Sequence, residues 1–325
     1  MSYWNDYLLQ VARRYSQEIW STEIISAAVG GSVGRGKADE FSDLDITVYV
    51  AEEQPSYDKD LVFEGTILQV QIMPQPSWEH IIQHPWNERF LLETIIIDDP
   101  SRKLTILKER FVAYLSLTEG RRRLIDNVQT IFNERKQWVS YSLQTGNMYS
   151  ATLASMATWT EAAFFYIFAS HNTLATSQLL PLLENDSTFA KVKKAWSLPQ
   201  HISRESACAV IRTLEKLRAY LREQYPTQQS TALSLLQDIL DGRKAKRYLC
   251  MGVYTQLVWE FAGEAFWIFL ETAQGMLWEK FLTTLPETLQ KEMKLLGFIE
   301  LDRSHIETLC NAGEEFMNQA IQILQ

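Results

Sequence analysis

The spacing of hydrophobic positions divides the chain into two parts. In the first third, a helical period over residues 3–20 precedes short apolar runs that have the length and alternation of β-strands. Glu64-Gly65 is a turn signal that favours a hairpin between two of these runs. The pattern predicts a small mixed sheet, with strands at 24–29, 44–50, 61–63, 66–73, 94–97 and 104–107, a polar loop at 52–60, and a helix at 76–92 bent by Pro85.

After Leu117 the strand signals stop. Apolar residues recur at intervals of three and four in the remaining two thirds, over 124–146, 149–170, 210–221, 244–274 and two segments ending near Leu324. We therefore predict an α+β fold, in which a mixed-sheet domain (residues 1–117) is followed by an all-α helical bundle domain (residues 118–325). The boundary is expected at Thr118–Arg123. The bundle would supply a substrate pocket or a partner surface.

Composition narrows the range of partners. Of 325 residues, 46% are hydrophobic and 22% are charged, which is ordinary for a globular protein. A net charge of −9 disfavours nucleic acid, whose phosphates need a basic surface, and suits a cationic small molecule or no charge preference. Three widely spaced cysteines fit neither a zinc site nor a disulfide framework. An oligomer is possible.

The sequence predicts no membrane role. The N-terminus lacks the basic segment and apolar core of a signal peptide. The longest apolar window, residues 149–170, contains too many polar side chains for a helix in lipid. With reduced cysteines, these features lead us to expect a cytoplasmic protein.

A glycine-rich turn, residues 30–37, follows the first predicted strand. Gly31 and Ser32 are expected to bind a phosphate, because backbone N–H groups and a hydroxyl in such a turn form an anion site. Arg35 and Lys37 are candidate contacts of a triphosphate. The alternative for these two basic residues is an ordinary solvated turn.

Two aspartates lie at the start of the next predicted strand. Alternate side chains of a strand point to one face, so Asp43 and Asp45 should point the same way. Mg²⁺ prefers carboxylate oxygens together with those of phosphates. We predict that Asp43 and Asp45 are metal ligands and catalytic residues, the alternative being two solvated strand positions.

The turn and the aspartate pair together resemble the signature of the DNA polymerase beta-like nucleotidyltransferase superfamily. The match reads Gly31-Ser32, then Arg35-Gly36, then Asp43-Leu44-Asp45. In layout the chain resembles bacterial antibiotic nucleotidyltransferases of the aminoglycoside type, which append a helical domain. The resemblance implies Mg²⁺ and an NTP, with ATP favoured, as cofactor and co-substrate. It also implies transfer of a nucleoside monophosphate to a hydroxyl of a small molecule.

The third carboxylate of that superfamily is missing. By strand parity, its position beside the aspartate pair is occupied by Gln69, and an amide cannot act as a general base. One reading is an enzyme in which another carboxylate substitutes. The alternatives are a catalytically impaired nucleotide-binding module, or a nucleotidyltransferase acting on a protein partner.

Carboxylates in the helical half provide two further hypotheses. Glu161 is the one charged residue between Tyr149 and His171, so it is a candidate catalytic base or amine ligand; the alternative is a structural ion pair between helices. Three more glutamates share a helix face with aromatic residues, which would suit a polycationic sugar or be a plain solvated face. They are Glu260, Glu264 and Glu271.

Overall fold

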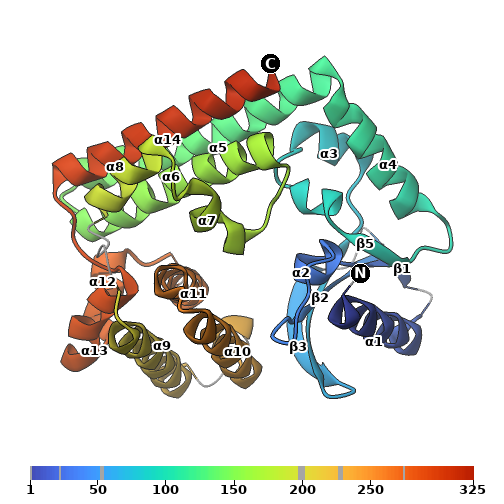
Figure 1. Cartoon of the computed structure of the whole chain (residues 1–325), viewed down its shortest axis with the longest axis horizontal. Helices are drawn as coiled ribbons and strands as arrows, with labels where there is room; N and C mark the ends of the chain where they lie inside the picture. The colour runs from blue at the N-terminus through green and yellow to red at the C-terminus, as the bar shows by residue number, and fades with distance from the viewer. Residues whose placement is uncertain (1, 22, 52–54, 197–201, 226–229, 274) are drawn as a thin grey trace. The chain divides into compact units, whose positions relative to one another are not determined.

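The structure is a computed structural model that describes residues 2–21, 23–51, 55–196, 202–225, 230–273 and 275–325 (Figure 1). The chain forms two compact units. The first comprises residues 1–127, 235–243 and 325, and the second comprises 128–234 and 244–324. The predicted division into domains at residues 1–117 and 118–325 stays a prediction.

A five-stranded mixed sheet forms the centre of the first unit. Its strand order is β3-β4-β2-β1-β5, and neighbouring strands are antiparallel except for the parallel pair β2–β4. This sheet, with many helices after it, confirms the predicted α+β fold class. The strands are β1 (Ile24–Val29), β2 (Leu44–Val50), β3 (Tyr57–Phe63), β4 (Thr66–Pro74) and β5 (Ile95–Asp98).

The two faces of the sheet have different covers. On one face, α1 (Tyr3–Ile19) packs Val11 and Tyr15 against buried strand residues that include Ile46 and Val70. On the other face, a smaller cluster gathers around Phe111 and the strand residue Tyr49. Because β2 alternates between the two faces, its apolar residues are buried whichever side they take, while Asp45 and Thr47 stay half-buried. The covering elements of this second face are α3 (Trp78–Gln83), η1 (Arg89–Leu92) and α4 (Lys103–Ser116).

Three local predictions were wrong. Residues 104–107 lie in α4 and not in a strand, because Leu104, Leu107 and Phe111 repeat at helical spacing and are all buried. Residues 57–60 begin β3, where a loop was predicted. The single helix expected at 244–274 is two helices, α10 (Leu235–Met251) and α11 (Tyr254–Ala273), separated at Gly252, whose φ is +69°.

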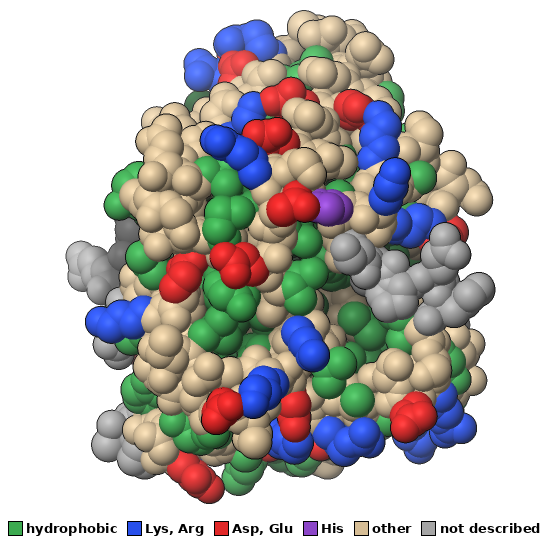
Figure 2. All heavy atoms as spheres, turned by 90° about the vertical axis from the view of Figure 1, so that its left-hand side faces the viewer, with side chains coloured by type: hydrophobic (Ala, Val, Ile, Leu, Met, Phe, Trp, Pro, Cys, Tyr) green, Lys and Arg blue, Asp and Glu red, His purple; other side chains and the backbone are tan. Residues whose placement is uncertain are grey.

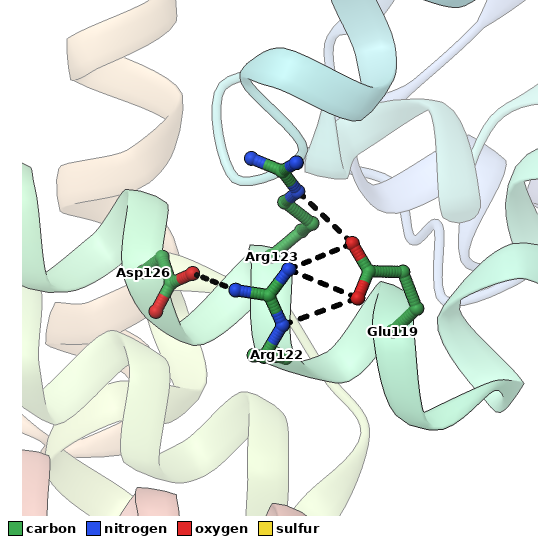
Figure 3. Close-up of polar contacts among 4 residues, drawn as sticks. All are labelled: Glu119, Arg122, Arg123 and Asp126. Atoms are coloured by element: carbon green, nitrogen blue, oxygen red, sulfur yellow. Dashed lines mark hydrogen bonds and ion pairs between the residues drawn. The ribbon is translucent and has the colours of Figure 1, made fainter.

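The predicted boundary segment is the first turn of α5 (Thr118–Gln144), and charged side chains stabilise it (Figure 3). Glu119 accepts hydrogen bonds from Arg122 at 2.8 Å and from Arg123 at 3.1 Å, and Arg122 also pairs with Asp126 at 3.1 Å. These contacts hold the pKa of Glu119 below its usual range. Pairs of opposite charge at helical spacing favour the helix, although solvent screens exposed pairs such as these. The segment where the boundary is predicted is therefore helical.

The second unit is all helical. Its α14 (Arg303–Leu324) packs along α6 (Met148–His171), and a Cβ at Gly313 of α14 would lie 3.2 Å from the Cα of Trp159 in α6. A second core joins α9 (Arg204–Gln224) to α11. The remaining elements are η2 (Thr176–Gln178), α7 (Leu179–Leu183), α8 (Ser187–Ala195), η3 (Thr231–Leu233), α12 (Trp278–Thr284), α13 (Glu287–Glu292) and η4 (Met293–Leu296).

The surface carries side chains of several kinds. On the face seen in Figure 2, hydrophobic side chains lie among acidic and basic ones. Within the described ranges, no helix has both the length and the apolar character that crossing a membrane requires.

Candidate functional site

The glycine turn and Asp45 lie in direct contact. Gly31 opens the four-residue helix α2 (Gly31–Gly34) with a φ of +57°, a conformation that favours glycine. A Cβ at Gly31 would lie 1.7 Å from Asp45 Oδ2. In addition, Gly30 N donates a hydrogen bond to the Asp45 carbonyl oxygen at 3.0 Å. The structure thus brings together Gly31 and Asp45, which lie fourteen positions apart in the sequence.

Ser32 places a buried hydroxyl in this turn. Its Oγ is shielded from solvent and has no hydrogen-bond partner among the described residues. A buried hydroxyl without a partner costs free energy, so such a group in a native fold calls for an explanation, and a ligand is one. The hydrogen bonds of α2 begin at Gly34 N, which donates to Gly30 O at 2.7 Å. The N–H groups of residues 31–33 therefore belong to the open end of this turn.

The two basic residues of the turn have different surroundings. Arg35 pairs with Glu93 at 3.2 Å, and both side chains are about four-fifths buried. Lys37 is exposed, and its backbone N–H donates to Ser32 O at 2.8 Å. Arg35 is thus anchored beside the turn, whereas the Lys37 side chain is accessible to an anion. Their roles as triphosphate contacts stay predictions.

A tight loop positions Asp43 ahead of β2. Asp39 caps this loop, since its Oδ1 accepts from Phe41 N at 2.9 Å and from Ser42 Oγ at 3.2 Å. Leu44, between the two aspartates, is fully buried against the α1 side of the sheet. Asp43 and Asp45 are both half-buried. Burial of Leu44 on one face is what directs its two neighbours to the other.

Gln69 lies beside Asp45, as the strand parity predicted. The parallel register pairs Asp45 with Gln69, and the antiparallel register pairs Gln69 with Asp60 on β3. Gln69 Nε2 donates to Gln237 Oε1 at 3.2 Å, and Gln237, itself buried, donates to Asp241 at 3.2 Å. The position of the missing carboxylate is therefore occupied by an amide within a side-chain network on the sheet.

Sequence reasoning missed three members of this polar face. Asp60 was placed in a loop, although Asp58 and Asp60 alternate as strand residues do. Gln237 and Asp241 come from a segment 168 residues after Gln69, and no local pattern could associate them with the sheet. The one available signal was a pair of polar residues four positions apart, Gln237 and Asp241, in the predominantly apolar start of α10.

The carboxylates present could hold part of a metal site. Among the described residues, no group of three His, Cys, Asp or Glu side chains converges in a metal-binding arrangement. Asp43 and Asp45 are the right ligand type for Mg²⁺, which is commonly bound by one or two carboxylates together with substrate phosphates. The donor set fits a metal that arrives with a nucleotide more closely than one held by the chain alone.

Glu161, the candidate base, lies in the second unit in an ion pair. Its Oε2 is 2.7 Å from Arg135 of α5, which also donates to the Ala157 carbonyl oxygen at 3.0 Å. Glu161 is buried, with 8% of its surface exposed. This is the structural arrangement that the sequence offered as the alternative, and a catalytic role for Glu161 stays a prediction.

Two of the three glutamates on the aromatic helix line a pocket in the second unit. Glu260 and Glu264 of α11 face a cavity of about 460 Å³, together with aromatic side chains. Burial raises the pKa of the Glu260 carboxyl, against the opposing influence of Lys244. Glu271 does not line this pocket and accepts a 3.4 Å hydrogen bond from Ser230.

One comparison with known proteins matches a part of the first unit. Residues 9–110 match the family model of the nucleotidyltransferase domain, and this range contains the turn, Asp43, Asp45 and Gln69. A nucleotidyltransferase domain implies a nucleotide substrate. No curated protein matches the chain.

A solved structure is also similar to the chain. It is a nucleotidyltransferase-like protein from Exiguobacterium sibiricum 255-15, which is 15% identical over 60% of this chain and 69% of its own, with a TM-score of 0.36.

Proposed function

We propose that the chain is a Mg²⁺-dependent nucleotidyltransferase that moves a nucleoside monophosphate from an NTP, with ATP favoured, to a hydroxyl of a small molecule. The observation that carries the proposal is the contact between Gly31 and Asp45, beside the buried Ser32 hydroxyl. The match of residues 9–110 to the nucleotidyltransferase domain supports it.

Each residue of the turn has a defined task in this proposal. Ser32 Oγ and the N–H groups at the open end of α2 would hold phosphate oxygens. Asp43 and Asp45 would hold Mg²⁺, which would offset phosphate charge when bound. Lys37 would contribute a mobile positive charge from the turn. Arg35, paired with Glu93, would act chiefly by fixing the turn.

The acceptor is proposed to bind in the helical half. An aromatic pocket with carboxylates in its wall supports a small molecule that carries a positive charge, and an antibiotic-type acceptor is one candidate. Activation of the acceptor hydroxyl is the step for which Gln69 is unsuited, because an amide accepts no proton at neutral pH.

A second function is favoured by one observation. The hydrogen bond from Gln69 to Gln237 ties the third-carboxylate position to another amide. That arrangement suits a nucleotide-binding module that has lost transfer activity.

Pyrophosphate release tests the two functions against each other. The wild-type chain, Asp45→Asn and Gln69→Glu are incubated with Mg²⁺, ATP and a panel of amino alcohols, aminoglycosides and proteins. The proposal expects acceptor-dependent release by the wild type and loss of release in Asp45→Asn. If the wild type binds ATP but releases nothing while Gln69→Glu does, the chain is the impaired module. Absence of release from both variants and the wild type would contradict the transferase proposal.

A further inference from the structure

The pocket in the second unit has walls that suit a flat or apolar ligand body. Its aromatic lining includes Trp259 and Trp267 of α11, with Trp196, Phe266 and Phe298 around them. Residues 153–164 of α6 supply further mainly apolar side chains. Large aromatic surfaces stabilise ligands by burial and by stacking, and their faces attract cations. At about 460 Å³, the cavity is in the range of small-molecule sites.

Four charged side chains line this cavity, and three of them have a specific partner of opposite charge. Lys244 Nζ pairs with Glu264 at 2.8 Å, and both side chains are largely buried. Arg135 pairs with Glu161 at 2.7 Å, just outside the lining. Within the residues that the structure describes, Glu260 is the lining charge that has no basic group at ion-pair distance. The pocket therefore carries one carboxylate in excess.

The carboxyl group of Glu260 accepts hydrogen bonds from two neutral side chains. Gln256 Nε2 donates to Glu260 Oε1 at 3.0 Å, and Tyr248 donates its phenol hydroxyl to the same carboxyl group. Two neutral donors favour the ionised form, whereas burial opposes it. A positive charge supplied by a ligand would offset the cost of burying this carboxylate.

We propose that this pocket binds an organic monocation with an apolar or aromatic body, whose ammonium group pairs with Glu260 while its body packs against Trp259 and Trp267. A polycationic or polyhydroxylated ligand fits less well, because one excess carboxylate neutralises one charge and the apolar wall would leave hydroxyls unpaired. The binding proposal stands by itself. The further statement that this monocation is the acceptor rests on the proposed transferase function.

Calorimetric titration of the full chain at pH 7.5 tests the binding. The probe is 4-amino-1-phenylbutane, with 4-phenyl-1-butanol as its neutral counterpart and spermine as a polycation. We expect the amine to bind about 10- to 100-fold more tightly than the alcohol, which is the range for a charge-assisted hydrogen bond. Equal affinity for amine and alcohol, or tighter binding of spermine, would overturn the proposal.

Two variants locate the site. Glu260→Gln should remove the preference for amine over alcohol, whereas Glu271→Gln, on the same helix but outside the lining, should keep it. Gly263→Leu should block both probes, because a Cβ at Gly263 meets open space inside the lining. Gly242→Leu is the matched control, at an exposed helical glycine with equally open surroundings. An unchanged amine preference in Glu260→Gln, or unchanged binding in Gly263→Leu, would place the ligand elsewhere.

The acceptor statement is measured separately. Pyrophosphate release from Mg²⁺–ATP is followed with 4-amino-1-butanol derivatives that carry an aryl group and a free hydroxyl. Release that requires both Asp45 and Glu260 supports the acceptor role. Binding without release, in a chain that does release pyrophosphate with another acceptor, overturns the acceptor role while the binding site and the transferase function both stand.

Discussion

The glycine-turn site and the aromatic pocket are built in opposite ways. The turn site consists of backbone and short side chains from residues 30–45, and its main contact, Gly31 with Asp45, leaves no room for a methyl group. The pocket draws long side chains from residues 135–298 on several helices, and at Gly263 it has space to spare. The first kind of site tolerates almost no change, whereas the second can adapt to its ligand.

The carboxylates of the two units show the same difference. Asp45 is positioned by strand register and by a backbone hydrogen bond to its own carbonyl oxygen. Glu161 and Glu260 are positioned by side chains, an arginine in one case and two neutral donors in the other. Substitution of Gly31 should therefore disturb its site sterically, whereas substitution of Glu161 or Glu260 should act through charge.

The largest effect is expected from Gly31→Ala. The added Cβ would overlap Asp45 Oδ2, and the positive φ disfavours alanine, so the free energy of unfolding should fall by at least about 2 kcal/mol. Gly36→Ala is the matched control, because its φ of +70° is similar but its Cβ would meet nothing within 4 Å. That change should cost only about 1 kcal/mol. Urea denaturation measures both, and equal losses would show that the contact with Asp45 is unimportant.

Breaking the ion pair between Arg135 and Glu161 should come next. Glu161→Gln leaves the partly buried guanidinium of Arg135 without its charge partner. The free energy of unfolding should fall by about 1–3 kcal/mol, a range that allows for solvent screening of Arg135, which is 35% exposed. Glu287→Gln, in the exposed pair with Lys291, should cost under about 0.5 kcal/mol. A catalytic role predicts a different result for Glu161→Gln: unchanged stability with loss of pyrophosphate release.

Removing the charge of Glu260 should stabilise the fold. Burial raises the pKa of this carboxyl above the ordinary 4.5, so the folded chain binds the proton more tightly than the unfolded chain. Stability is then lost as pH rises from about 4.5 through the higher folded pKa. Glu260→Gln should raise the free energy of unfolding by about 1 kcal/mol at pH 7. The extra stability of Glu260→Gln should vanish below pH 4, where the carboxyl group is protonated in both states. Extra stability that persists there would contradict burial of the charged form as its cause.

The smallest effect is expected at the start of α5. Glu119→Gln weakens exposed pairs with Arg122 and Arg123 and should lower the free energy of unfolding less than any of the changes above. Because these side chains are exposed, 0.5 M salt should reduce the difference further. A loss as large as that of Glu161→Gln would mean that this network does more than support the start of the helix.

Local patterns predicted the parts of the molecule that are built locally. The strands at 24–29 and 44–50 and the hairpin turn at Glu64-Gly65 were confirmed, because alternation and turn chemistry act over a few residues. The turn and aspartate motif could likewise be found by inspection. Residues 104–107 were predicted wrongly, because a short apolar run fits a strand or a buried helix equally well.

The rest of the two sites depends on contacts between distant residues. The bond from Gln69 to Gln237 spans 168 residues, and the pair of Arg135 with Glu161 joins two helices. No periodicity in the sequence encodes such partners. The sequence could show that Glu161 and Glu260 are unusual carboxylates, but only packing showed that Glu161 pairs with an arginine, whereas Glu260 pairs with none in the part of the chain that the structure describes.

Thermal unfolding with Mg²⁺ and each NTP tests the central claim, that Asp45 and the glycine turn form a nucleotide site. A ligand at 100 times its Kd adds about 2.7 kcal/mol to the stability of the folded chain, which the unfolding temperature reports clearly. The account predicts a Mg²⁺-dependent rise for the wild type and for Asp58→Asn, an exposed residue of β3, and none for Asp45→Asn. Equal rises in wild type and Asp45→Asn, or no rise in the wild type with any NTP, would contradict it.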